Sequence, residues 1–265
     1  MNKKIFLLTI ILVLIVLVII AMQFTLYQRS VEEKLNVRLK GAYDVYYNFY
    51  QGLSFYNGLW YFSDREYIAA TKSLNGTAVL ENKLPISYDL YKEGYDHIGD
   101  IDVEDGVVYA PLEDKDYSKP LVALYDADTL KLIGTIGPLE QRHMPWCAVD
   151  SGNELIYSSE FSDVNEIYVY NMKGEKVRVI RLNATLQRVQ GGDLEDRYLY
   201  LTTDDGGDWI YRVNIETGEV VRVAAVKTPY EMEGVEVHEG TLYALVGTPR
   251  WMKNKVYVFI LYSSG

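Results

Sequence analysis

The chain has 265 residues, a formal net charge of −11 at pH 7 and a single cysteine, Cys147. The negative charge argues against nucleic acid as a partner, because phosphates need a basic surface that this composition does not supply. One cysteine excludes an internal disulfide and a zinc site built from several cysteines. With 49% hydrophobic residues and 24 tyrosines, the chain has the composition of a packed globular protein, and cations or neutral molecules are its easier partners.

An apolar segment lies near the N-terminus. Residues 5–24 follow a short basic head, residues 1–4, and contain only two polar residues, Thr9 and Gln23. As a helix this segment is roughly 30 Å long, enough to span the core of a bilayer. A cleavable signal peptide has a similar pattern, but the run is longer than a usual signal sequence and no small-residue cleavage site follows it. The sequence therefore predicts an uncleaved transmembrane signal anchor.

The rest of the chain is expected to lie outside the cytoplasm. Basic residues after the apolar segment outnumber those before it, which opposes the positive-inside rule, but a large domain behind a short head is translocated largely regardless of charge. Residues 25–42 are predicted to form a charged stalk, with a short helix or spacer at Val31–Lys40. The expectation is a single-pass membrane protein whose domain at residues 43–265 is extracytoplasmic.

A repeated pattern organises this domain. Five segments of similar sequence align on the tyrosines Tyr61, Tyr109, Tyr157, Tyr200 and Tyr243, at steps of 48, 48, 43 and 43 residues. A period of this size with short alternating strands is typical of β-propeller blades rather than of one sandwich. The predicted fold is therefore all-β, a propeller of five four-stranded blades behind one transmembrane helix.

The last repeat lacks sequence for a complete blade. After Lys255–Tyr262 the chain reaches residue 265, so a fourth strand has to come from elsewhere, since an unpaired sheet edge invites association with other chains. The alternating apolar run Tyr43–Phe49 precedes the first repeat. We expect it to supply the missing strand and to close the ring by an N-terminal strand.

Propeller topology also predicts where the polar residues gather. The start of each inner strand and the end of each second strand lie on one face, around the central channel. Acids, amides, histidines and a tryptophan fall at these positions, which is more polar than packing requires. The predicted ligand-binding residues are Gln51, His97, Asp100, Glu113, His143, Trp146, Glu160, Arg188, Gln190, Asp205 and Glu233.

Three motifs at this mouth each allow two interpretations. His97-Ile-Gly-Asp100 places an imidazole beside a carboxylate for metal binding or acid–base chemistry, or else caps a loop. Trp146 is a candidate platform for a ring or sugar, or else fills the wall between blades. Asp204-Asp205-Gly-Gly-Asp208 has oxygen ligands spaced for calcium, or else is a flexible acidic turn. No catalytic residue or metal ligand is assigned from the sequence.

Several short stretches are similar to known propellers. The five repeats look like quinoprotein-like extracytoplasmic propellers over residues 43–262. Phe49-Tyr-Gln51-Gly-Leu53, followed by Gly58-Leu-Trp-Tyr61, resembles the opening of the glutamine cyclotransferase-like five-bladed propellers, and Glu233-Gly-Val is similar to the start of their last blade. His97-Ile-Gly-Asp100 stands where that family has Glu-Gly-Trp-Gly. The resemblance therefore implies the five-bladed fold and not the cyclisation of amino-terminal glutamine.

Three functions remain open from the sequence. The first is a membrane-anchored propeller that binds a small polar ligand, a protein or a cation such as calcium at its acidic mouth. The second is an enzyme, either a cyclotransferase-like acyl transferase or a metal-assisted hydrolase, with His97, Asp100, Glu113 and Glu233 near the reacting atom. The third is a disc that binds proteins through exposed aromatic residues. The first is the working hypothesis, and it assumes no catalysis.

Overall fold

The computed structural model describes residues 14, 15, 18 and 35–263. The predicted membrane anchor, residues 5–24, lies outside the described residues except for Leu14, Ile15 and Val18. Within the described part, no helix combines the length and the apolar composition needed to cross a membrane. Residues 37–261 form one compact unit.

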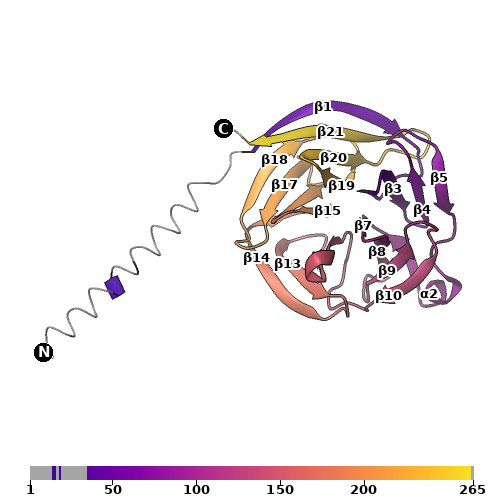
Figure 1. Ribbon diagram of the computed structural model, residues 1–265, viewed down its shortest axis with the longest axis horizontal. Coiled ribbons are helices and arrows are strands. Elements are labelled where there is room, and N and C mark those ends of the chain that lie inside the picture. The colour runs from indigo at the N-terminus through magenta and orange to yellow at the C-terminus, as the bar shows by residue number, and fades with distance from the viewer. Residues whose placement is uncertain (1–13, 16–17, 19–34, 264–265) are drawn as a thin grey trace, which may run out of the picture. The chain divides into compact units, whose positions relative to one another are not determined.

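This unit is a ring of five antiparallel sheets, so the predicted five-bladed propeller is confirmed (Figure 1). Blades 1 to 4 follow one another along the chain and each begins with its inner strand. Blade 1 consists of β2 (Gly52–Tyr56), β3 (Leu59–Asp64), β4 (Tyr67–Thr71) and β5 (Ala78–Asn82). Blade 2 consists of β6 (Tyr95–Ile98), β7 (Asp102–Glu104), β8 (Val107–Asp114), β9 (Leu121–Asp126) and β10 (Leu132–Ile136). Blade 3 consists of β11 (Ala148–Asp150), β12 (Leu155–Ser158), β13 (Val164–Asn171) and β14 (Lys176–Leu186). Blade 4 consists of β15 (Val189–Glu195), β16 (Tyr198–Thr203), β17 (Trp209–Asn214) and β18 (Val220–Ala225).

Blade 5 closes the ring by combining strands from the two ends of the unit. Its sheet order is β19 (Met232–His238), β20 (Thr241–Val246), β21 (Asn254–Ser263) and β1 (Leu35–Val45). Figure 1 shows β1 and β21 side by side along the edge of the ring. Closure by an N-terminal strand is thus confirmed, and pairing with β1 covers the edge that β21 would otherwise expose.

The position of the closing strand differs from the prediction. β1 ends at Val45 and a turn follows, whereas a strand was expected at Tyr43–Phe49. β1 also begins at Leu35, so residues 35–42 of the predicted stalk belong to a sheet, and neither the helix nor the spacer considered for Val31–Lys40 extends past Leu35. The alternating sequence of β1 pairs with β21. Strand pairing therefore overrides the helical tendency of the charged residues.

Local sequence explains the hairpins between inner and second strands. Asn57, Asp105, Asp196 and Glu239 occupy these turns with φ between 48° and 56°. Asparagine and aspartate tolerate this left-handed conformation better than most residues, and a turn of this hand matches the twist of the strands. The turns fix the strand register, and with it the place of each repeat tyrosine.

Four of the five repeat tyrosines belong to, or pack against, hydrophobic cores between neighbouring blades. Tyr61 belongs to a core that joins blades 1 and 2, Tyr109 to one that joins blades 2 and 3, and Tyr157 to one that joins blades 3 and 4. Tyr243 packs against the core between blades 5 and 1. An aromatic ring fills the space between two twisted sheets, which gives the sequence its period.

Blade 2 departs from the regular pattern. Its inner strand is split into β6 and β7, which both pair with β8 on either side of Gly99–Ile101. A five-residue helix, α2 (Tyr88–Lys92), with Ser87 as its N-cap, precedes β6 and was not predicted. The interruption lets Asp100 leave the strand and enter the centre of the ring.

Candidate functional site

The Asp100 carboxylate joins three other blades at the centre of the ring. Its Oδ1 accepts the backbone N–H of Leu53 at 3.1 Å, and its Oδ2 accepts those of Gly192 at 3.0 Å and Val235 at 3.2 Å. The donors have the same register in blades 1, 4 and 5, since each pairs with the residue after its repeat tyrosine. Cys147 N–H of blade 3 donates to the Asp100 carbonyl at 3.4 Å. Asp100 therefore links all five blades.

Glycines make this convergence possible. A Cβ atom at Gly234 would lie 2.6 Å from Asp100 Oδ1, and one at Gly191 would lie 2.6 Å from Oδ2. Gly52 is similarly close to Asp100 on the side of blade 1. Any side chain at these positions would push the carboxylate away from its donors. The glycines that open these repeats thus serve the central contact.

A second layer of polar residues lies opposite the repeat tyrosines. Ser54, Asp102, Asp193 and Glu236 pair with Tyr61, Tyr109, Tyr200 and Tyr243. Asp102 Oδ2 accepts Val149 N–H at 2.7 Å, and Asp193 Oδ2 accepts Val237 N–H at 2.6 Å, so each carboxylate again bridges two blades.

Burial dominates the ionisation of this second layer. It raises the pKa of Asp102 to about 7. Burial and then the nearby Asp102 charge raise the pKa of Asp193, and burial and then the Asp193 charge raise the pKa of Glu236. All three are at least nine-tenths buried. They therefore act as structural hydrogen-bond acceptors rather than as groups open to solvent.

The mouth of the channel holds a cavity of about 350 Å³. Its walls come from the segment before β2, the loop after β3, strand β6, the starts of β15 and β19, and the loop after β20. The lining residues are Tyr50, Gln51, Asp64, Arg65, His97, Gln190, Glu231, Glu233, Thr248, Pro249 and Arg250. The predicted mouth residues Gln51, His97, Gln190 and Glu233 are thus brought together.

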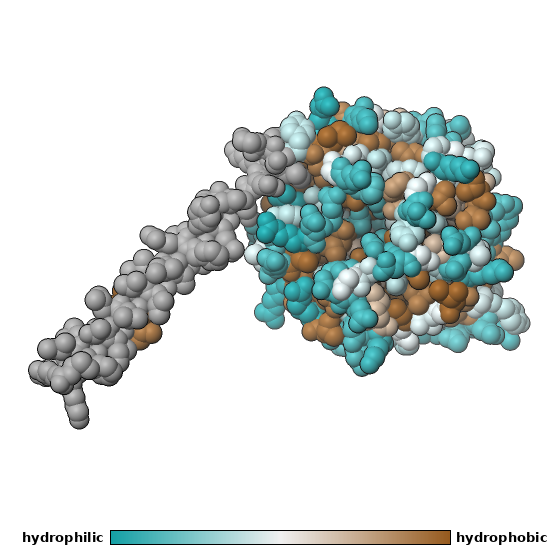
Figure 2. Space-filling model, viewed as in Figure 1, coloured by the Kyte–Doolittle hydropathy of each residue, from teal (hydrophilic) through white to brown (hydrophobic). Residues whose placement is uncertain are grey.

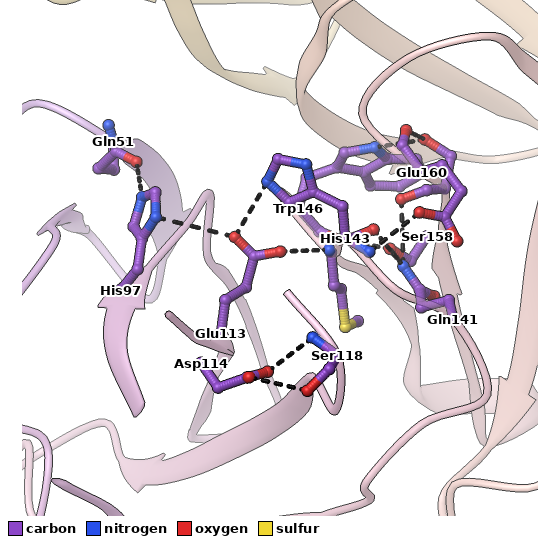
Figure 3. A network of polar contacts seen from close by, with 12 residues as sticks. Gln51, His97, Glu113, Asp114, Ser118, Gln141, His143, Trp146, Ser158 and Glu160 are labelled. Carbon is purple, nitrogen blue, oxygen red and sulfur yellow. Dashed lines mark hydrogen bonds and ion pairs between the residues drawn. The ribbon is translucent and has the colours of Figure 1, made fainter. Parts of the chain in front are cut away.

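A chain of polar side chains runs from this cavity into the protein (Figure 3). Gln51 Oε1 lies 2.5 Å from His97 Nε2. His97 Nδ1 lies 3.8 Å from Glu113 Oε2, and His143 Nε2 lies 3.2 Å from the same oxygen. Glu113 Oε1 accepts Met144 N–H at 2.5 Å. Figure 3 shows the Glu113 carboxylate between the two imidazoles, so these residues form one network across blades 1, 2 and 3.

The His97 ring is held in its neutral form. Burial, followed by the charges of Arg65 and His143, lowers the pKa of His97 to about 3. With one proton on the ring, one nitrogen donates and the other accepts. Neither His97 Nδ1 nor Glu113 Oε2 has a hydrogen bond of good geometry among the described residues. The network therefore keeps unused hydrogen-bonding capacity.

His143 is positioned by the loop before blade 3. Glu160 accepts the backbone N–H groups of Arg142 at 3.0 Å and His143 at 2.9 Å. The His143 ring lies between two aromatic rings, with centroids 4.2 Å from Tyr117 and 5.0 Å from Phe161. Glu160 thus fixes the loop instead of facing the cavity, and the aromatic contacts were not predicted.

Glu233 is the most unusual carboxyl group at the mouth. Its side chain is 3% exposed, it lines the cavity, and its Oε1 has no hydrogen-bond partner in the described part of the chain. Burial, followed by Glu231, raises the pKa of Glu233 well above its usual value. A buried acceptor without a donor costs free energy. A ligand that donates to Glu233 Oε1 would recover it.

Basic residues form ion pairs with the acids of the cavity wall: Arg250 lines the cavity, and Arg188 lies beside it and contacts the lining residue Glu231. Arg188 pairs with Asp204 and with Glu231 Oε1 at 3.3 Å. Arg250 Nη2 lies 3.5 Å from Asp64 Oδ2. The predicted ligand-binding residues include Arg188 but not Arg65, which lies in a loop without a motif, and not Tyr50, which lies within the Phe49–Leu53 motif next to Gln51.

Three other predicted ligand-binding residues, Trp146, Asp100 and Asp205, do not line the cavity. Trp146 is fully buried and donates from Nε1 to Ser159 Oγ at 3.0 Å, so it fills the wall between blades rather than forming a platform for a ligand. Asp100 is 1% exposed and lies below the mouth. Asp205 accepts Gly207 N–H at 2.9 Å within its own loop.

The aspartates of the predicted calcium motif point to different partners. The Asp204 carboxylate pairs with Arg188, and the Asp205 carboxylate accepts the N–H of Gly207 within its own loop. Across the part of the chain that the structure describes, no three acidic, histidine or cysteine side chains are arranged to hold a metal ion.

The closed ring of five antiparallel sheets, four of them four-stranded and one with its inner strand split in two, defines the protein as a five-bladed β-propeller. Glutaminyl cyclase from Myxococcus xanthus has a similar structure, with a TM-score of 0.66 and 12% identity over 87% of this chain and 98% of that one. BamB from Moraxella catarrhalis gives a TM-score of 0.40 and 16% identity over 79% and 59% of the two chains. The WD40 propeller domain of Doa1 gives 0.45 and 14% over 78% and 77%. The predicted likeness to cyclotransferase-like propellers is thus confirmed for the fold.

A family match covers more than half of the chain. Residues 92–242 match a repeat of unknown function, DUF6923, and the chain belongs to this family. The matched segment extends from α2 through blades 2, 3 and 4 into β20. A search of curated proteins found no match.

Proposed function

We propose that this propeller binds a small polar ligand at its mouth, through a cationic or hydrogen-donating group placed against Glu233. The observation that carries the proposal is the buried, unpartnered Glu233 Oε1 in the wall of a 350 Å³ cavity. A cavity of this volume accommodates a metabolite or a short peptide end rather than a folded partner. No catalytic step is assumed.

Membrane attachment is part of the same proposal. Residues 5–24 supply the apolar length for one membrane span. In this proposal the propeller lies on the extracytoplasmic side. The test is extraction of cell membranes at alkaline pH together with protease protection in intact cells. Release of the full-length protein by alkali, or protection of the propeller inside intact cells, would contradict this part.

The binding test uses simple ammonium ions as probes. Ethylammonium and butylammonium are expected to raise the melting temperature of the full-length protein, because a ligand specific to the native state stabilises it by mass action. Glu233→Gln should remove the increase, because the neutral glutamine amide cannot ionise and so supplies no negative charge to the ammonium ion. Glu216→Gln, at an exposed turn, is the matched control. An equal response of all three proteins, or no response of the wild type, would refute the proposal.

Acyl transfer of the glutamine cyclotransferase type is a second candidate. The network of Gln51, His97, Glu113 and His143 favours it, because a neutral imidazole between a cavity and a carboxylate is suited to moving protons. The assay is loss of ammonia from a peptide with amino-terminal glutamine, followed by mass spectrometry. Turnover that His97→Ala abolishes would establish catalysis. Absence of turnover alongside ammonium binding would favour the binding function.

A further inference from the structure

Most charged side chains around the mouth cavity form ion pairs with one another, and two ionisable side chains remain outside these pairs. Glu231 pairs with Arg188 at 3.3 Å, and Asp64 pairs with Arg250 at 3.5 Å. Besides Tyr50, whose pKa burial raises, and the neutral imidazole of His97, the remaining ionisable side chains among the lining residues are Glu233 and Arg65. Neither forms an ion pair with a basic or acidic side chain among the described residues. The cavity thus has one acidic and one basic side chain outside its ion pairs.

Arg65 is anchored at its backbone although its side chain is exposed. Its N–H donates to Asp64 Oδ1 at 2.8 Å, and its carbonyl accepts Ile98 N–H at 2.9 Å. The guanidinium is near enough to His97 to help lower the pKa of that ring. The planar guanidinium can bind both oxygens of a carboxylate at once, which a lysine could not do. Arg65 is therefore suited to an anionic group at the edge of the cavity.

The cavity is large enough for both contacts to be made by one molecule. A sphere of this volume would be about 9 Å across, the size of an amino acid or a dipeptide. The side of Arg65 is open, because a groove of about 840 Å³ also includes Asp64, Arg65 and Arg250 in its walls. The side of Glu233 is buried. A ligand would thus insert its donor end first and leave its acceptor end toward the groove.

We propose that the ligand is a zwitterion, with its ammonium group on Glu233 and its carboxylate on Arg65. This inference rests on the proposed binding function and adds the second charge. The raised pKa of Glu233 favours its neutral form in the empty cavity, and an ammonium group bound beside it would favour the carboxylate. A zwitterion would then satisfy both Glu233 and Arg65, whereas a simple cation would satisfy only Glu233. The pairs already formed by Arg188 and Arg250 need not break.

The test compares ligands that differ only in their end groups. Glycine, 4-aminobutanoate and 6-aminohexanoate vary the distance between charges, and each is compared with the alkylammonium ion and the carboxylate of similar chain length. Calorimetry on the full-length protein should show that one zwitterion binds about tenfold or more tightly than the alkylammonium ion and the carboxylate of similar chain length. This corresponds to a difference in binding free energy of about 1.4 kcal/mol. Arg65→Gln should reduce that zwitterion to the affinity of the alkylammonium ion and leave the latter unchanged.

Three results separate the two proposals. If the alkylammonium ions bind as tightly as every zwitterion and Arg65→Gln changes nothing, the zwitterion inference is wrong while the binding function stands. If neither class binds, both are wrong. If Glu233→Gln weakens butanoate as much as it weakens the zwitterion, the assigned orientation is wrong. Arg65→Lys is the matched variant, and it should retain part of the gain because it keeps the charge without the planar fork.

Discussion

Replacing Asp100 by alanine is expected to destabilise the whole ring. The substitution leaves the backbone N–H groups of Leu53, Gly192 and Val235 buried without their acceptor. Each unsatisfied donor costs about 1–3 kcal/mol, so the free energy of unfolding should fall by about 3–9 kcal/mol. Domains are stable by only about 5–15 kcal/mol. Loss of this one carboxylate therefore removes a large part of the total.

Urea unfolding of the full-length protein, followed by tryptophan fluorescence, measures this loss. Trp146 is fully buried beside the centre and provides the signal. Asp100→Asn keeps one acceptor oxygen and should lose about 1–3 kcal/mol, because its amide N–H₂ faces at least one N–H donor. Asp128→Ala, at an exposed turn, is the control and should change stability by less than about 0.5 kcal/mol. A loss below about 1 kcal/mol for Asp100→Ala would refute the central role.

Three further predictions concern the centre and the mouth. The pKa of Asp102 is about 7 in the folded state and about 3.9 when unfolded, so its contribution to stability is full below pH 4 and lost as pH rises through 7. Asp102→Asn should therefore lose less stability than wild type between pH 5 and pH 8 in urea titrations, and parallel curves would contradict this. Gly234→Ala should cost about 1–3 kcal/mol by displacing the Asp100 carboxylate; an unchanged urea midpoint would show that the centre can adapt. The ring of His97, with a pKa of about 3, should keep constant ¹⁵N shifts from pH 8 to pH 5, and a titration within that range would exclude the neutral network.

The strand order and the period of the blades could be read from the sequence. Each repeat encodes its inner hairpin locally, through a turn that accepts positive φ and a tyrosine that faces the next blade. Such contacts join residues close in the chain, so alternation and turn residues are sufficient to predict them. The same reasoning found the mouth residues Gln51, His97, Gln190 and Glu233. The start of β1 was missed because its pairing partner, β21, lies at the other end of the unit.

Only the tertiary structure decided what each polar residue does. Asp100 receives its hydrogen bonds from residues 47, 92 and 135 positions away, and no local pattern indicates such partners. Trp146 and Asp100 became buried, while Glu233 was left without a donor and Arg65 without an acid. Whether a charge is neutralised depends on which side chains the ring closure brings within a few ångströms. The sequence therefore determined the ring, and the contacts between blades determined which residues form its candidate site.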